Sequence, residues 1–390
     1  MSLNFDKSHW KRVAFGDVVR NVNETVRDLE AAGINRVIAM EHMDPGELKV
    51  SRWGSTEDGT TFTRRVKPGR TLFGKRRAYQ RKVAYAEFDA ICSGDIYTFE
   101  ADETQLRGEL LPFLVQSNGF FEHALGTSAG SLSPRTNWRD LKDFEFDLPP
   151  LEEQKRITNL LWAVERHKVA VTCAHQRLVD FRAAWRESVF GNPSNTARLD
   201  DRADVILGRQ RAPQHASGDH MRDYVRSANI SNGQLMLDDV KQMNFTPAEQ
   251  EKFRLQAGDV LISEGTASPR ELGSSAMWDP SDPEKEMYFQ KTLLRLRARD
   301  GLSTPVLLRE WARWAQESGA FVRVATGTGI LHITGVRCAA MSFPVLSTAE
   351  SEAFAFRAGE LGNASLALQS ELENLEALRS SLVNEIFGGK

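Results

Sequence analysis

The sequence lacks the features of several protein classes. Its 390 residues contain three cysteines, Cys92, Cys173 and Cys338, an odd number with no zinc-type spacing, so we expect neither a disulfide framework nor a metal site. No apolar run approaches the ~18 residues of a membrane span, and the N-terminus lacks the apolar run of a signal peptide. The net charge of −3 excludes a uniformly basic surface but allows one basic face. We therefore expect a cytoplasmic protein that binds no membrane.

The composition is that of a folded protein. Hydrophobic residues make up 41% of the chain and charged residues 26%, which is enough apolar material for packed cores. A length of 390 residues predicts two or three domains.

An internal repeat is the clearest feature of the sequence. Phe190-Gly191 recurs 197 residues later as Phe387-Gly388, and each pair ends a stretch with an apolar residue at a constant heptad position. Five such heptads predict a coiled-coil seam rather than an ordinary surface helix. The predicted seam residues are Ile157, Val164, Val171, Leu178 and Trp185, with Leu161 and Phe181 at intermediate positions, and Phe354, Leu361, Leu368, Leu375 and Leu382, with Leu372 and Leu378.

The repeat predicts four segments. Two globular α+β segments, 1–148 and 192–343, each precede a long-helix segment, 149–191 and 344–390. The helices themselves are expected over 151–190 and 348–387, packed antiparallel so that the two halves are related by a pseudo-twofold axis. A second match, of 117–127 with 318–328, supports the duplication.

Shorter elements inside the globular segments follow from local pattern. Strands are predicted at Val83–Tyr85, Ile96–Phe99, Val260–Ser263 and Thr292–Arg297, and helices at Asn21–Ala32, Gln105–Gln116 and Val306–Glu317.

One stretch concentrates basic charge. Residues 64–82 contain nine Lys or Arg residues, no acid and two aromatic residues. Such a block predicts nucleic-acid contacts, because arginine suits phosphates and guanine edges and tyrosine can stack or hydrogen-bond; the alternative is a solvated surface ribbon. The predicted DNA-binding residues are Arg64, Arg65, Lys67, Arg70, Lys75, Arg76, Arg77, Tyr79, Arg81 and Lys82 in the first globular segment, and Arg209, Arg211, Arg226, Asn229, Ser263, Thr266, Ser268 and Arg270 in the second.

The search for catalytic motifs finds only partial matches. Gly69–Lys75 is spaced like a phosphate-binding loop, but Arg76 stands where a Ser or Thr would hold magnesium, and the segment is expected to form a β-hairpin. No cluster has metal-ligand spacing, and no nucleophile or base is evident. We predict no catalytic residues in this chain.

Several motifs resemble one family. The segment 148–157, which reads Leu-Pro-Pro-Leu-Glu-Glu-Gln-Lys-Arg-Ile, together with the long helix behind it and the duplication, resembles the specificity subunit of type I restriction-modification systems. The second copy, 343–347, lacks the Glu-Gln pair. Residues 67–73 and 256–262 are both similar to the family's Gly-Asp-Val-Leu strand, with Arg70 in place of the usual acid.

The resemblance implies a non-catalytic subunit that takes part in phage defence. Each globular segment would be a target recognition domain that reads one half of a bipartite, asymmetric site in double-stranded DNA. The helices would set the gap and dock two modification subunits, which bind S-adenosylmethionine and methylate adenine N6. Restriction subunits that use ATP and magnesium would join the complex, and this chain would bind no cofactor itself.

Two other classes of function stay open from the residues alone. A self-contained nuclease or NTPase would hydrolyse DNA or ATP as the purified chain. A coiled-coil scaffold that binds only proteins would show no duplex binding that weakens steeply with salt.

Overall fold

The computed structural model describes residues 5–128, 130, 134–282 and 284–388. The ends of the first and last predicted segments, 1–4 and 389–390, lie outside the described residues. The chain divides into two compact units, one of residues 1–172 and 370–390 and the other of residues 173–369. Both boundaries fall inside long helices, so each unit contains one globular segment and part of each helix. The four segments predicted from sequence follow a different division and stay a prediction.

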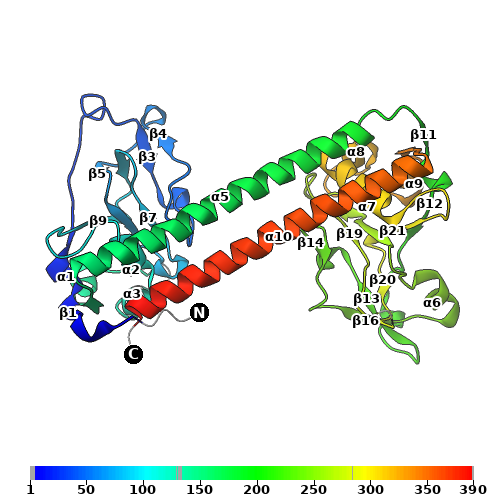
Figure 1. Cartoon of the computed structure of the whole chain (residues 1–390). Helices are drawn as coiled ribbons and strands as arrows, with labels where there is room; N and C mark the ends of the chain where they lie inside the picture. Colours follow the sequence, from blue (N-terminus) through cyan, green and yellow to red (C-terminus); the bar gives the residue numbers. More distant parts are fainter. Residues whose placement is uncertain (1–4, 129, 131–133, 283, 389–390) are drawn as a thin grey trace. The chain divides into compact units, whose positions relative to one another are not determined.

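The first unit is built mainly from short strands (Figure 1). Its elements are β1 (Lys11–Ala14), α1 (Phe15–Val18), β2 (Val19–Asn21), β3 (Arg36–Ile38), β4 (Gly54–Ser55), β5 (Arg64–Val66), β6 (Thr71–Gly74), β7 (Val83–Tyr85), β8 (Ala90–Cys92), β9 (Ile96–Ala101), α2 (Leu111–Gln116), α3 (Asn118–Gly126), α4 (Trp138–Leu141), β10 (Glu145–Leu148) and the first part of α5 (Leu151–Phe190).

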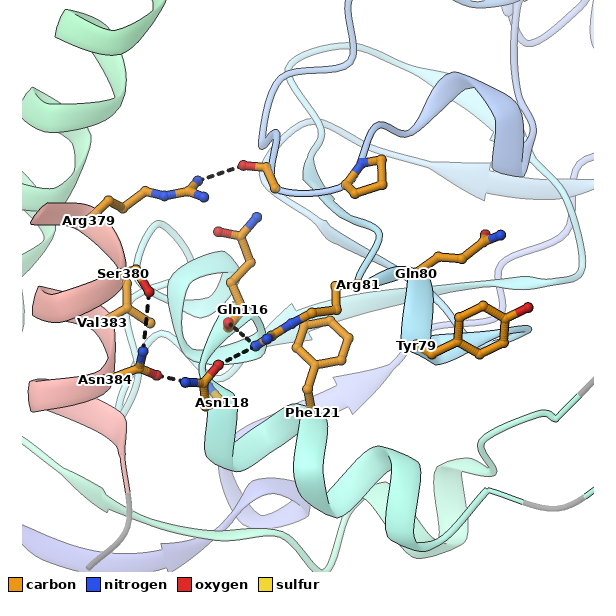
Figure 2. Close-up of a pocket in the computed structure, with 12 residues that line it drawn as sticks. Tyr79, Gln80, Arg81, Gln116, Asn118, Phe121, Arg379, Ser380, Val383 and Asn384 are labelled. Atoms are coloured by element: carbon orange, nitrogen blue, oxygen red, sulfur yellow. Dashed lines mark hydrogen bonds between the residues drawn. The ribbon is translucent and has the colours of Figure 1, made fainter. Parts of the chain in front are cut away.

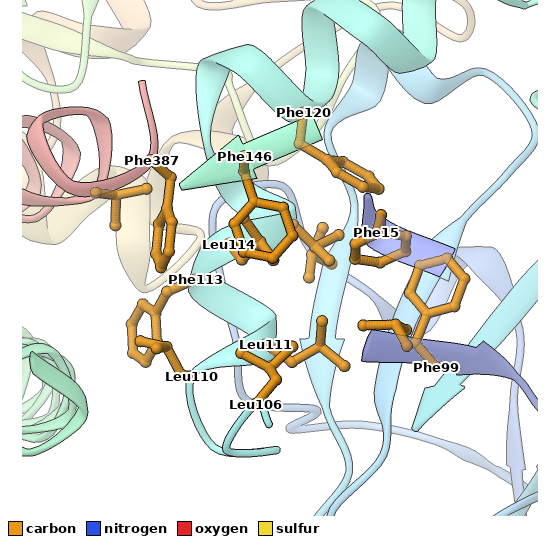
Figure 3. Close-up of a cluster of buried hydrophobic side chains, with 14 of the residues drawn as sticks. Phe15, Phe99, Leu106, Leu110, Leu111, Phe113, Leu114, Phe120, Phe146 and Phe387 are labelled. Atoms are coloured by element: carbon orange, nitrogen blue, oxygen red, sulfur yellow. The ribbon is translucent and has the colours of Figure 1, made fainter. Parts of the chain in front are cut away.

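Two four-stranded sheets organise this unit. Their strand orders are β2-β9-β6-β7 and β4-β3-β8-β5, and β1 pairs with β10. A cluster of buried aromatic and aliphatic side chains joins the first sheet to α2, α3 and the C-terminal end of α10 (Thr348–Phe387). Figure 3 shows Phe15, Phe99 and Phe120 together in this cluster, with Phe387 entering from α10. The sheet and the helix end therefore share one core.

The second unit is also built from short strands and short helices. Its elements are β11 (Thr196–Arg198), β12 (Ala203–Leu207), β13 (Met221–Val225), β14 (Ile230–Ser231), β15 (Gln234–Leu235), β16 (Lys241–Asn244), α6 (Pro247–Phe253), β17 (Val260–Ser263), β18 (Gly265–Thr266), β19 (Ser275–Met277), β20 (Tyr288–Phe289), β21 (Leu293–Ala298), α7 (Pro305–Glu317), α8 (Ala320–Val324), β22 (Leu331–His332), α9 (Gly335–Ala339), β23 (Ser342–Pro344) and the remaining parts of α5 and α10.

The two units repeat one sheet plan. In the second unit the four-stranded order is β12-β21-β17-β19, all antiparallel, which matches β2-β9-β6-β7 strand for strand along the chain. A helix pair follows each sheet, α2 and α3 in one unit and α7 and α8 in the other. The strand before each long helix pairs with the start of its globular segment, as β1 with β10 and β11 with β23. The duplication predicted from sequence is therefore present in the fold.

Both long helices have the predicted bounds, Leu151–Phe190 and Thr348–Phe387. Within the first unit, Glu165 on α5 bonds Arg379 on α10, and Lys168 pairs with Glu376, so rising numbers on one helix meet falling numbers on the other. Within the second unit, Trp185 stacks on Phe354 with ring centroids 4.7 Å apart. The helices are antiparallel, as predicted.

One predicted helix is wrong. Residues 22–32 form turns and an isolated bridge instead of a helix. The backbone N–H groups of Val22 and Val26 donate to Thr98 and Thr63, so this segment follows the sheets. These backbone groups are bonded to residues far away in sequence and not to the next helical turn. The strands predicted at Val83–Tyr85, Ile96–Phe99, Val260–Ser263 and Thr292–Arg297 agree with β7, β9, β17 and β21, and the later helix agrees with α7. Of Gln105–Gln116, only the part from Leu111 is α-helical.

Candidate nucleic-acid interface

The first half of the basic block is neutralised inside its own unit. Glu24 lies 3.0 Å from the Lys67 ammonium and 3.1 Å from the Arg70 guanidinium, and these two bonds, that of Lys67 first, lower the Glu24 pKa. Arg65 bonds Asp89 at 2.9 Å, and Arg70 is buried with Glu100 as a second partner. The block contains no acid in sequence, but the fold brings these carboxylates to it. Arg70 is therefore buried and paired with carboxylates of its own unit.

The second half of the block forms the loop between β6 and β7, residues 75–82, which we call the tip loop. Lys75 lies over the Tyr97 ring at 4.9 Å, and its burial lowers its pKa. The Lys82 ammonium donates to the Met40 carbonyl at 2.7 Å. The side chains of Arg77, Tyr79 and Arg81 are exposed. Positive charge and an aromatic ring are thus presented together at this loop. In β5, Arg64 donates to the Ile96 carbonyl at 2.8 Å.

Arg81 anchors the tip loop. Its guanidinium lies 4.7 Å from the centre of the Phe121 ring and donates to the Asn118 side chain at 2.6 Å. Figure 2 shows it pointing toward Asn118 and Gln116, across a pocket of about 440 Å³, while the Tyr79 ring points the other way. Partial burial of the guanidinium against Phe121 lowers the Arg81 pKa. This arginine positions the loop and is less available to a ligand than Arg77.

A neighbouring arginine was missed by the sequence prediction. Arg135 pairs with Arg76 in an isolated antiparallel bridge, and the guanidinium groups of both approach Asp95, at 3.2 and 3.4 Å. Arg135 is 53 residues beyond the end of the block, so no local charge pattern could include it. The bridge adds one more arginine beside the tip loop.

Comparison with known proteins identifies this architecture. The sequence model of a family described as the type I restriction modification DNA specificity domain matches residues 9–175. Residues 9–175 are therefore similar to a type I restriction-modification DNA specificity domain. The predicted resemblance to specificity subunits is confirmed.

Three relatives are similar to this chain over different lengths. The specificity subunit of the type I restriction enzyme EcoDI from Escherichia coli is 29% identical over 122 residues, which span 31% of this chain and 27% of the relative. A solved chain from a study of complex assembly and conformational transition in the type I R-M system has a TM-score of 0.61 at 17% identity, covering 97% of this chain and 98% of its own. The type I S subunit from M. genitalium has a TM-score of 0.58 at 13% identity, covering 100% and 99%. Because the sequence identities are this low, these two matches show only that this chain shares its fold with the two solved structures.

The second unit has a loop that is topologically equivalent to the tip loop of the specificity domain. It joins β17 to β19, covers residues 264–274, and contains the predicted residues Thr266, Ser268 and Arg270. Both loops are held by the segment that follows the helix pair: β18 pairs with β22 in the second unit, as Arg76 pairs with Arg135 in the first. Two segments chosen separately from sequence therefore occupy one position in the repeated plan.

Polar groups surround the second loop. Ser263 and Thr266 line a pocket of about 550 Å³ together with Ser275 and Gln316. The Thr266 hydroxyl accepts from the backbone N–H of Ser268 at 3.1 Å. Where the tip loop has several arginines, this loop has hydroxyl groups and one arginine, Arg270.

The other predicted contacts of the second unit are of two kinds. Arg209 is buried and bonds both oxygens of Glu249 at 2.8 Å, and Asn229 is buried with its side chain on backbone groups. Arg226 pairs with Asp239 at 2.7 Å. These three side chains are held by contacts within the unit. Arg211 and Arg270 are exposed, and no bond of their side chains occurs among the described residues.

The helix seam differs from prediction at its intermediate positions. Phe181 and Leu378 remain 48% and 41% exposed, so they do not lie in the seam. Phe181 lies three residues after Leu178, and Leu378 lies three residues after Leu375. The buried intermediate positions of the seam instead lie four residues after the heptad residue. The buried or half-buried seam residues are Ile157, Leu161, Val164, Val171, Leu178 and Trp185, and Phe354, Leu361, Leu368, Leu372, Leu375 and Leu382.

Near the middle of the helices, the seam position four residues after an apolar heptad residue is occupied by a charged side chain. The sequence did not predict this. Lys168 is buried, with Glu47 at 2.7 Å and Glu376 at 3.6 Å. Arg379 bonds Glu165 and the Gly46 carbonyl. Lys168 and Arg379 each lie four residues after an apolar heptad residue. A search for charged residues at that spacing could therefore have located them.

Within the described chain, no three His, Cys, Asp or Glu side chains form a group that could hold a metal ion. No helix of the described residues is both long and apolar enough to cross a membrane.

Proposed function

We propose that this chain is the DNA-recognition subunit of a type I restriction-modification complex. Each unit reads one half of a bipartite, asymmetric site in double-stranded DNA. The observation that carries the proposal is the repeated sheet, which holds a polar or basic loop at the same position in each unit, in a chain with a specificity domain. A repeated scaffold with divergent loops suits two unlike half-sites.

The long helices set the gap between the half-sites and dock two modification subunits. Those partners bind S-adenosylmethionine and methylate adenine N6 after taking the base out of the stack. Restriction subunits, with ATP and magnesium, complete the complex in the cytoplasm. The chain itself contributes recognition and assembly and no catalytic group.

The decisive experiment maps adenine methylation across a host genome with and without this chain. We expect one split motif with a constant gap to lose methylation when the chain is removed. Unchanged methylation would contradict the proposal.

A second measurement uses the purified full chain and duplex DNA. We expect the affinity for the duplex to fall steeply as salt is added. In a plot of the logarithm of the binding constant against the logarithm of the salt concentration, each neutralised phosphate contributes about −0.9 to the slope. Hydrolysis of DNA or ATP by the chain alone would favour an enzyme instead, and no duplex binding would favour a protein scaffold.

A further inference from the structure

The backbone of the tip loop is strained at two arginines. Arg77 and Arg81 have φ values of 55° and 52°, in the left-handed region that side-chain-bearing residues seldom adopt. Between them, Ala78–Gln80 form a single 3-10 turn. Strain of this kind persists only where the surrounding structure imposes it, and it is concentrated at functional sites.

Contacts on both sides hold the turn in place. The Arg77 backbone N–H donates to the Pro134 carbonyl at 2.8 Å, and the Arg81 backbone N–H donates to the Ala78 carbonyl at 2.8 Å. Ala78 is buried, and the Arg81 side chain is fixed by Phe121 and Asn118. The turn is therefore a rigid platform on the β6–β7 hairpin.

The platform presents one aromatic side chain that the fold does not use. Tyr79 is 55% exposed, and among the described residues its ring stacks on no other ring and its hydroxyl makes no hydrogen bond. Arg77 beside it is exposed and, within the same described part of the chain, its guanidinium has no bond. Folding alone gives no reason to strain the backbone around an unpartnered tyrosine.

We propose that Tyr79 is a specificity-determining residue of the first unit. Its ring offers an apolar face for a base or a thymine methyl group, and its hydroxyl can donate to or accept from a base edge. Arg77 contacts the phosphate backbone and Arg81 is a positioning residue. This inference rests on the proposed function and names the side chain that reads the first half-site.

Tyrosine suits this task for a physical reason. It supplies a large contact area with few rotatable bonds, so it loses little conformational entropy when it binds. A rigid turn reduces that cost further, because the loop is already in its bound conformation. Arg77 adds affinity for DNA of any sequence, whereas Tyr79 adds discrimination between base pairs.

The test selects preferred duplexes from a random library with the purified full chain. For Tyr79→Ala we expect one or two positions of a single half-site to lose about tenfold of their preference, with the other half-site unchanged. Tyr79→Phe separates the ring from the hydroxyl, since it restores whatever preference depends on the ring alone. Arg77→Gln should instead weaken binding to all sequences and reduce the salt slope by about 0.9.

A matched control is Phe356→Ala, which removes an exposed aromatic ring on α10, outside the globular segments. It should leave both half-sites unchanged. Thermal unfolding verifies that Tyr79→Ala is folded, as its exposure leads us to expect.

Two outcomes separate this inference from the proposed function. If the wild-type chain selects a split motif and folded Tyr79→Ala selects the same motif with full preference, the role of Tyr79 is wrong and DNA recognition stands. If the wild-type chain selects no motif, both are wrong.

Discussion

Arginine side chains in this protein have two distinct roles, and only tertiary contacts separate them. Arg70 and Arg209 are buried and held by glutamates, whereas Arg77 is exposed in the tip loop. A buried guanidinium with a carboxylate partner stabilises the fold, because an unpaired buried charge is costly. An exposed one is available to phosphates.

The pair of Arg209 and Glu249 predicts acid sensitivity of the second unit. The Arg209 guanidinium lowers the Glu249 pKa from 4.5 to about 2. Because the folded pKa lies below the unfolded one, the pair stabilises fully above pH 4.5, and this contribution is lost as the pH falls toward 2. Thermal midpoints measured from pH 7 to pH 3 should therefore fall less steeply for Glu249→Gln than for the wild type.

The control for this measurement is Glu251→Gln on the same helix, α6. Glu251 is exposed, with no ion pair among the described residues, so its loss should leave the pH dependence unchanged. Equal acid sensitivity of the wild type and Glu249→Gln would contradict the assignment.

At the scale of elements, charged clusters fix the long helices to their globular neighbours. In the second unit, Arg186 on α5 lies 3.1 Å from Glu310 and 2.8 Å from Glu317, both on α7. In the first unit, Lys168 on α5 pairs with Glu47 of the globular segment. Apolar contacts alone tolerate sliding, while such directional bonds specify one register.

The cluster in the second unit predicts unequal costs for two similar substitutions. The side chain of Glu310 is 2% exposed and that of Glu317 is 31% exposed. Glu310→Gln leaves Arg186 buried without its most enclosed charge partner, so we expect a loss of about 3 kcal/mol in unfolding free energy. Glu317→Gln should cost about 1 kcal/mol or less, because solvent screens that pair. Denaturant titration of both variants measures the difference, and equal losses would show that burial does not set the cost.

At the scale of the whole molecule, one plan is used twice with different loops. The sheets share their strand order. The equivalent loops present several arginines and a tyrosine in one unit, and hydroxyl groups with the single arginine Arg270 in the other. A scaffold under packing constraints keeps its pattern, whereas surface loops can change without loss of the core.

The proposed role of the helices predicts a length effect. One heptad inserted into both α5 and α10 lengthens each by about 10 Å, which corresponds to about three base pairs. We expect the preferred gap in the selected DNA site to lengthen or recognition to fail, and methylation mapping or duplex selection measures either result. An unchanged gap would show that the helices do not set it. Insertion into α5 alone puts the two seams out of register and serves as the control.

The sequence alone was sufficient to predict the long helices, the duplication and several strands. Heptad periodicity and the repeated Phe-Gly pair are local signals, and they placed α5 and α10 within their observed bounds. The four strands predicted from apolar runs were also correct, since a buried strand needs such a run wherever it packs. The helix predicted at 21–32 failed because the backbone N–H groups of Val22 and Val26 bond to residues more than 30 positions away.

Only the tertiary structure decided which of the predicted contact residues are exposed and which are paired within the fold. Glu24, Asp89 and Glu100 lie outside the basic block in sequence but neutralise its first half in the fold. Arg135 joins the tip loop from a distant segment, and Tyr79 is left without a partner in the described chain. Electrostatic pairing depends on distance in space, whereas the pattern of a sequence reports only neighbours along the chain.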